Sequence, residues 1–130
     1  MTAFSLAAAQ SISIAGDVPA NIERHLAFMR AAAQQGVQLL VFPELSLTGY
    51  EPSLAAELAI ASEDQMLAPL REMAQELRLT VVVGMPIRLA PQAGVLIGAL
   101  VLGADGSLAV YTKQHLHDGE EVAFVPGQGG

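Results

Sequence analysis

The chain has 130 residues, of which 52% are apolar and 15% charged, and it carries a formal net charge of −7. This length suits one ordinary domain, and the apolar content excludes a disordered chain. The acidic balance argues against a nucleic-acid partner, because phosphate binding needs clustered Lys and Arg. The sequence has no cysteine, which excludes disulfides and a cysteine nucleophile within these residues.

The N-terminus has no basic segment of the kind that opens a signal peptide. The most apolar run in the later part of the chain, residues 95–102, is far shorter than a membrane span. We therefore expect a cytoplasmic protein that has no membrane partner.

Strand and helix patterns alternate from the start of the chain. Residues 3–9 are typical of a buried strand, and Asp17 and Pro19 are start signals for a helix that ends at Gly36. Apolar residues recur at helical spacing between them, namely Ile22, Leu26, Met29 and Ala33. A second buried strand is predicted over residues 37–42.

The next segments continue this order. A loop or short helix is expected over 53–61, followed by a helix with Pro69 in its first turn. That helix has one apolar face, formed by Met66, Leu70, Met73 and Leu77. A β-branched run over 80–86 predicts a third strand, and a loop follows at 89–94.

Two further strands, 95–102 and 107–112, flank Asp105-Gly106, a pair typical of a hairpin turn. The resulting order of β-α-β-α-β and an antiparallel hairpin predicts an α/β domain or a portion of one.

Glu44 comes directly after the second strand and before the turn at Gly49. Open α/β sheets build active sites at the carboxyl ends of their strands, so Glu44 is a candidate general base. The same residues also fit a strand-to-loop transition with a solvated acid.

Lys113 follows the last strand, and several carboxylates come after it in one loop. A lysine held near carboxylates stays protonated, and in a dry site it stabilises a developing oxyanion. A surface ion pair of little energetic weight is the competing interpretation.

Two colinear motifs connect these residues: Phe42-Pro43-Glu44-Leu45 with Thr48-Gly49-Tyr50, and Tyr111, Lys113, His115-Leu116, Glu120 and Phe124-x-Pro126-Gly127. Together they resemble the nitrilase superfamily of carbon–nitrogen hydrolases. The resemblance runs from the first strand to the last residues. It implies an α/β fold of the α-β-β-α sandwich type, of which residues 1–130 would be about the amino-terminal half.

The resemblance also implies roles for individual residues. Glu44 would be the general base and Lys113 the oxyanion-stabilising cation. Glu120 would be the second glutamate, with Glu121 as the alternative, and Tyr50 either lines the substrate pocket or is a packed loop aromatic. The family's nucleophilic cysteine would lie on a later strand beyond Gly130, so residues 1–130 would be a partial domain that lacks it.

The implied function is hydrolysis of an amide, carbamoyl compound or nitrile through a Glu-Lys-Cys site, with no metal or organic cofactor. This chain alone would then be inactive. The alternative is a truncated, inactive relative that serves as an interaction module. Subunits of the family often pair, so the resemblance also implies a homo-oligomer such as a dimer.

Three expectations concern the surroundings of the site. Glu44 and Lys113 should meet at the carboxyl ends of neighbouring strands. His115 and His117 lack a third ligand for zinc; the resemblance makes His115 structural and hydrogen-bonded, and His25 is expected on the surface. Strands as apolar as 37–42, 80–86 and 95–102 should leave one sheet face uncovered in a half-fold.

Overall fold

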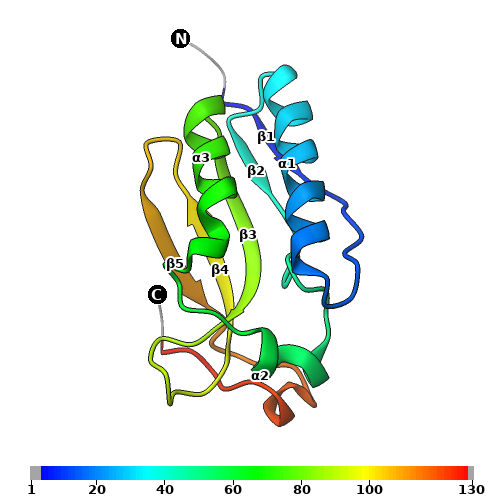
Figure 1. The fold of residues 1–130 in the computed structure, drawn as a ribbon, viewed down its shortest axis with the longest axis vertical. Coiled ribbons are helices and arrows are strands. Elements are labelled where there is room, and N and C mark those ends of the chain that lie inside the picture. The colour runs from blue at the N-terminus through cyan, green and yellow to red at the C-terminus, as the bar shows by residue number, and fades with distance from the viewer. Residues whose placement is uncertain (1–3, 129–130) are drawn as a thin grey trace.

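The computed structural model describes residues 4–128 and shows one five-stranded sheet with its two long helices on the same face (Figure 1). The strands are β1 (Leu6–Ala8), β2 (Leu39–Val41), β3 (Thr80–Ile87), β4 (Leu96–Leu102) and β5 (Leu108–Thr112). The helices are α1 (Val18–Gln34), α2 (Ala55–Leu58) and α3 (Ala68–Leu77), with 3₁₀ turns at Pro52–Leu54, Gln65–Leu67 and Glu120–Val122. These bounds confirm the predicted order of elements; Ala3, placed in the first predicted strand, lies outside the described residues.

The sheet has the order β1-β2-β3-β4-β5. β1, β2 and β3 are parallel, with Leu40 opposite Val81, and β4 and β5 continue as an antiparallel meander, with Val101 opposite Ala109. β4 runs opposite to β3, and β5 runs opposite to β4. The carboxyl end of β5 therefore lies on the same side of the sheet as the carboxyl ends of β2 and β3. The expectation that Glu44 and Lys113 follow neighbouring strands is wrong, since β3 and β4 lie between β2 and β5.

Helix α1 begins and ends where its sequence predicts. The Asp17 carboxylate accepts a hydrogen bond from the Ala20 amide at 3.2 Å, and Pro19 lies in the first turn, where its missing N–H is harmless. Gly36 follows the helix with φ +78°, a conformation that costs glycine little.

The core lies between the two helices and the inner face of the sheet. It contains Met29 from α1, Leu70 from α3 and alternate residues of β3, such as Val81 and Val83. One α1 residue in this layer was predicted wrongly. His25 is buried, with 2% of its surface exposed, because it lies one helical turn from Ile22 and Met29 and so shares their inward face.

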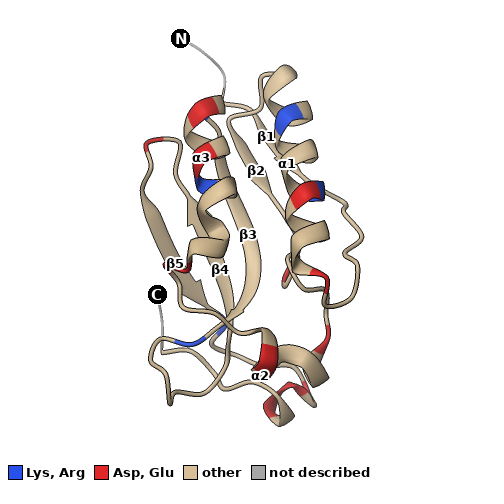
Figure 2. Cartoon of the chain, viewed as in Figure 1, with Lys and Arg blue, Asp and Glu red and all other residues tan. Residues whose placement is uncertain are grey.

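Within residues 4–128, no helix lies over the outer face of the sheet (Figure 1). Apart from Thr80 its side chains are apolar or aromatic, and Leu6 and Tyr111 at its margins are 62% and 51% exposed. All five strands lack Lys, Arg, Asp and Glu, which lie on the helices and loops instead (Figure 2). No helix within residues 4–128 is long and apolar enough to cross a membrane.

We predict that the isolated chain associates through this outer face, since large apolar patches are rare on soluble monomers. Val101, which lies opposite Val82 on that face, provides the test. Light scattering of the dilute chain should show dimers or larger species, and Val101→Glu should reduce them. Ala27→Glu, on the exposed side of α1, is the matched control and should have no such effect. A stable monomer would contradict the prediction.

Candidate active site

The loop of residues 43–49, here called the Glu44 loop, leaves β2 and crosses over β3. Phe42 donates to the Val82 carbonyl at 2.9 Å, as in a parallel ladder, and Leu47 then donates to the Gly84 carbonyl at 2.9 Å. A Cβ atom on Gly84 would overlap the backbone nitrogen of Leu45 and lie 2.9 Å from the Pro43 carbonyl oxygen. The crossing therefore depends on the missing side chain of Gly84.

Leu45 makes the tight turn that directs Glu44 outward. Its φ of +54° is left-handed, which costs an L-residue roughly 1–2 kcal/mol. Its carbonyl accepts from the Gly49 amide at 2.8 Å, and its buried side chain packs in a second apolar cluster. That cluster also contains Ala55, Val95, Ile97 and Phe124. Packing and hydrogen bonds thus hold a strained turn directly after Glu44.

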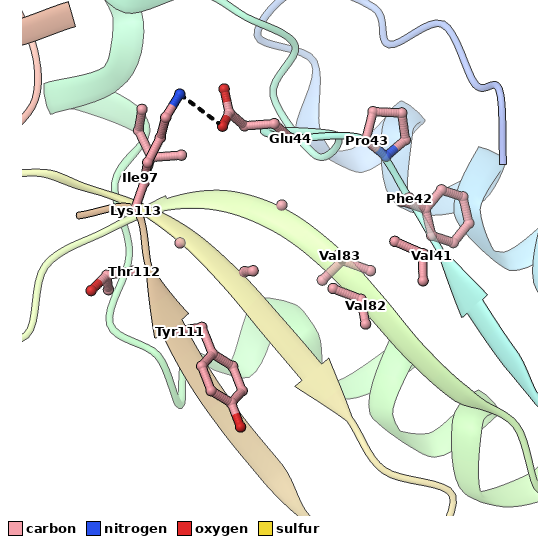
Figure 3. Close-up of a pocket in the computed structure, with 13 residues that line it drawn as sticks. Val41, Phe42, Pro43, Glu44, Val82, Val83, Ile97, Tyr111, Thr112 and Lys113 are labelled. Carbon is pink, nitrogen blue, oxygen red and sulfur yellow. Dashed lines mark ion pairs between the residues drawn. The ribbon is translucent and has the colours of Figure 1, made fainter. Parts of the chain in front are cut away.

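Lys113 reaches the same place from β5. Its amide donates to the Ile97 carbonyl at 3.0 Å, which extends the β4–β5 pairing past the end of the strand. Its ammonium nitrogen lies 3.2 Å from Glu44 Oε2 and 3.2 Å from Glu120 Oε1 (Figure 3 shows the Glu44 pair). The side chains of Lys113, Glu44 and Glu120 are 19%, 43% and 2% exposed. The predicted proximity of these three residues is confirmed.

The Glu120 carboxylate is fixed by several donors. The His117 amide donates to Oε1 at 2.7 Å, and the Tyr50 hydroxyl donates to Oε2 at 2.8 Å. Phe124, buried beside Leu45, anchors the short turn that carries Glu120. Glu121, the alternative for the second glutamate, is exposed.

The charges in this cluster stabilise one another. Burial alone would lower the pKa of Lys113, but hydrogen bonds and charges from Glu120 and Glu44 outweigh it and raise that pKa above 10.5. The His117 amide, with help from Tyr50 and Lys113, lowers the pKa of Glu120 despite its burial. The hydrogen bond to Glu120 raises the pKa of Tyr50. At neutral pH Glu120 is therefore a carboxylate and Lys113 an ammonium.

Other predicted site residues fit less closely. Tyr50 is 51% exposed and contacts Glu120, but it does not line the neighbouring cavity, so its substrate-binding role stays a prediction. His115, expected to be structural, is exposed, and its side chain makes no hydrogen bond within residues 4–128. In the same described region, no group of three or more His, Asp or Glu side chains is arranged to hold a metal ion.

A cavity of about 370 Å³ opens beside the charged cluster (Figure 3). Glu44 and Lys113 lie on its rim, and its floor is the outer face of the sheet. The floor residues include Val41, Val82, Ala99 and Tyr111. An apolar cavity with a few convergent charged groups is the usual form of a small-molecule site.

Comparison with known proteins shows the family of the chain. The family model described as carbon-nitrogen hydrolase matches residues 5–130. The chain belongs to the carbon-nitrogen hydrolase family. Three solved structures show the likeness in detail, and all are of an amidase from Nesterenkonia sp..

The first is that amidase itself, with 30% identity and a TM-score of 0.81 over 96% of this chain and 48% of the amidase chain. The NitN amidase from strain AN1 has 29% sequence identity and a TM-score of 0.83, over 97% of this chain and 50% of the amidase chain. A cysteine-to-alanine mutant in complex with butyramide has 30% sequence identity and a TM-score of 0.82, over 96% of this chain and 49% of the amidase chain. The chain thus spans about half the length of these amidases.

This carbon-nitrogen hydrolase chain also contains site-supporting residues that sequence reasoning did not find. Gly84 lies inside the predicted strand over 80–86, and an isolated glycine within a strand signals close backbone approach. Ser46 and His25 support the Glu44 loop on the side that faces α1. For His25, only its helical spacing with Ile22 pointed to burial.

Gly84→Ala should destabilise the chain by about 1–3 kcal/mol, the usual range for overpacking, because its Cβ would push the Glu44 loop off β3. Urea unfolding measures the change. Gly36→Ala shows the effect of replacing a glycine without crowding, because its Cβ position is open and the substitution adds only the strain of a positive φ. An unchanged free energy of unfolding in Gly84→Ala would contradict the crowding argument.

The lowered pKa of Glu120 makes stability depend on pH in a defined direction. The contribution of Glu120 is fully present above its unfolded-state pKa of 4.5 and is lost as pH falls through the lower folded-state value. The free energy of unfolding should therefore fall on acidification, and Glu120→Gln should flatten this acid limb. Glu121→Gln, next to it and exposed, should leave the limb unchanged. If the free energy of unfolding of Glu120→Gln fell at acid pH as much as that of the wild type, the cluster would not be binding Glu120 in its charged form.

Proposed function

We propose that this chain supplies the general base and the oxyanion-binding cation of an amidase site. The observation that carries the proposal is one ammonium, that of Lys113, shared by two carboxylates at the rim of an apolar cavity. Membership of the carbon-nitrogen hydrolase family and likeness to solved amidases support the same class of reaction.

Glu44 is the proposed general base. It is the more exposed of the two carboxylates and lines the cavity, whereas Glu120 is buried and saturated with donors. Glu44 would take the proton from a cysteine thiol, and the thiolate would attack the amide carbon. When the C–N bond breaks, Glu44 would return the proton to the leaving nitrogen. It would then activate water to hydrolyse the thioester.

Lys113 is the proposed oxyanion stabiliser. A lysine ammonium has three N–H donors, and the Lys113 nitrogen contacts Glu44 Oε2 and both carboxylate oxygens of Glu120. One N–H shared between the two Glu120 oxygens would leave the third donor for the oxygen of a tetrahedral intermediate. Glu120 would keep Lys113 charged and aimed, because its own position is fixed by the His117 amide and Tyr50.

The proposed nucleophile is a cysteine from residues other than these 130, which contain none. We propose that the cysteine belongs to polypeptide packed on the outer face of the sheet, where the cavity is open. The chain spans about half of the solved amidases, and in one mutant of that amidase acrylamide has added to the active-site cysteine. The notion of an inactive interaction module rests on the same uncovered face and missing cysteine.

The proposed substrate is the amide of a small aliphatic acid. The cavity is small and its floor is apolar, with Val41 and Val82 beside Glu44. The Nesterenkonia amidase was solved in complex with butyramide and, as another mutant, with acrylamide. Carbamoyl compounds and nitriles have no comparable support.

Activity in a complete polypeptide that contains this chain tests the assignment. Glu44→Gln should lower kcat for butyramide by roughly 10²–10⁴-fold, the usual contribution of general acid–base catalysis. Lys113→Ala should lower it by about 10²–10³-fold, as for other oxyanion donors. Glu57→Gln on α2, exposed and carrying the same charge change, is the control.

Ammonia release measures turnover, and circular dichroism checks that the variants fold. The 130-residue chain alone should release no ammonia, since it has no thiol with which to form a thioester. Normal turnover of Glu44→Gln, or turnover by the chain alone, would overturn the proposed function. Binding of a partner without turnover by the complete polypeptide would favour the interaction module.

A further inference from the structure

The underside of the Glu44 loop rests on a buried hydrogen-bond chain that the proposed reaction does not use. The Gly84 amide donates to Ser46 Oγ at 3.1 Å, and Ser46 Oγ lies 2.8 Å from His25 Nε2. On the other side of the ring, His25 Nδ1 lies 2.7 Å from the Asn21 carbonyl oxygen. His25 and Ser46 are both buried.

The donor and acceptor roles in this series of hydrogen bonds follow from the group at one end, the Asn21 carbonyl. A carbonyl oxygen can only accept, so His25 Nδ1 carries a proton and donates to Asn21. Burial lowers the pKa of His25 below 6.5, against the opposing effect of the Asn21 hydrogen bond, so the ring is neutral at neutral pH. Nε2 is then an acceptor, and the Ser46 hydroxyl donates to it while accepting from Gly84.

The same face of α1 holds the loop at several other points. The His25 ring stacks on Phe42, with centroids 4.0 Å apart, and Phe42 is the residue from which the loop departs. The Asn21 side-chain amide donates to the Leu47 carbonyl at 2.9 Å. These contacts fall on both sides of the strained Leu45, whose left-handed turn requires external support.

We propose that His25 is a positioning residue for the Glu44 loop, acting through Ser46 to keep the loop on β3 and Glu44 aimed at Lys113. The consequence for catalysis rests on the proposed function of Glu44. The positioning itself does not, and it is measurable without any turnover.

Protonation of His25 breaks this arrangement. Nε2 becomes a donor, so the Ser46 hydroxyl loses its acceptor. The groups that face the ring are the Asn21 carbonyl on α1, Ser46 on the loop and Phe42 just after β2, and none of them carries a charge. Nearby ionisable groups point elsewhere, since Glu23 and Arg24 are exposed on α1 and Glu44 pairs with Lys113.

Amide hydrogen exchange followed by mass spectrometry tests the proposal on the 130-residue chain, whether or not the chain associates. His25→Phe keeps a ring against Phe42 but removes both hydrogen bonds. Exchange at residues 43–49 and at Gly84 should become about 5–10-fold faster, as expected for one lost hydrogen bond of ordinary strength. Ser46→Ala should act similarly, and the double variant should exchange little faster than either single one, since both remove the same contact.

Two further variants separate the hydrogen bond from packing and from charge. Phe28→Leu weakens the aromatic contact with Phe42, whose ring lies 5.9 Å from that of Phe28, and should leave exchange in the loop unchanged. His25→Gln offers Ser46 an amide oxygen as acceptor and cannot titrate. It should keep the protection of the loop nearer to the wild type than His25→Phe does.

The pH dependence gives a readout that a merely structural role would not move. In the wild type, protection factors at residues 43–49 should fall as pH drops below 6.5, the ordinary pKa of histidine, whereas His25→Gln should show no such fall. Loop exchange unchanged in His25→Phe, or equally faster in the loop and in α3, would overturn the proposal.

If His25→Phe fails to fold, the pH profiles of the wild type and His25→Gln decide: a difference between them supports the proposal and identical profiles reject it. A different result is that exchange in the loop changes as expected while no complete polypeptide turns over an amide. That result would reject the proposed function and leave the positioning role intact.

Discussion

The site depends on one close approach, that of the Glu44 loop to β3 at Gly84. Glu44 starts from β2 and Lys113 from β5, with two strands between them, so the carboxylate can reach the ammonium only if the loop crosses the sheet edge. The crossing places the Leu45 backbone where a side chain on Gly84 would be. A left-handed Leu45 then turns Glu44 outward, and Phe124 and its cluster hold that turn.

The charged cluster adds a second constraint, because the buried carboxylate of Glu120 depends on the donors around it. Glu120 is almost fully buried, and an isolated buried carboxylate costs several kcal/mol unless donors surround it, as in related desolvated ion pairs. The His117 amide, Tyr50 and Lys113 provide those donors. The same contacts keep Lys113 protonated and oriented. Glu120 therefore holds the Lys113 ammonium in place, and the more exposed Glu44 is not needed for that purpose alone.

The sequence predicted features that local rules determine. Asp17 and Pro19 marked the start of α1, Asp105-Gly106 marked the hairpin, and two motifs predicted that Glu44, Lys113 and Glu120 lie together. It failed where tertiary packing decides. His25 looked like a surface residue because its neighbours Glu23 and Arg24 are charged, yet its helical position faces the core. The crossing of β3 was not visible either, because strand order and loop path depend on contacts distant in sequence.

The open sheet face and the open cavity are the same surface, since Val41, Val82, Ala99 and Tyr111 belong to both. Any layer that covers the sheet would therefore also roof the site. Covering it would exclude water and lower the local dielectric, which strengthens every interaction of Lys113 with its carboxylates and with a substrate oxygen. Burial of the apolar face would supply the free energy for that closure. On the proposed function, covering the sheet would therefore also enclose the site, and the proposed thiol would arrive with the covering layer.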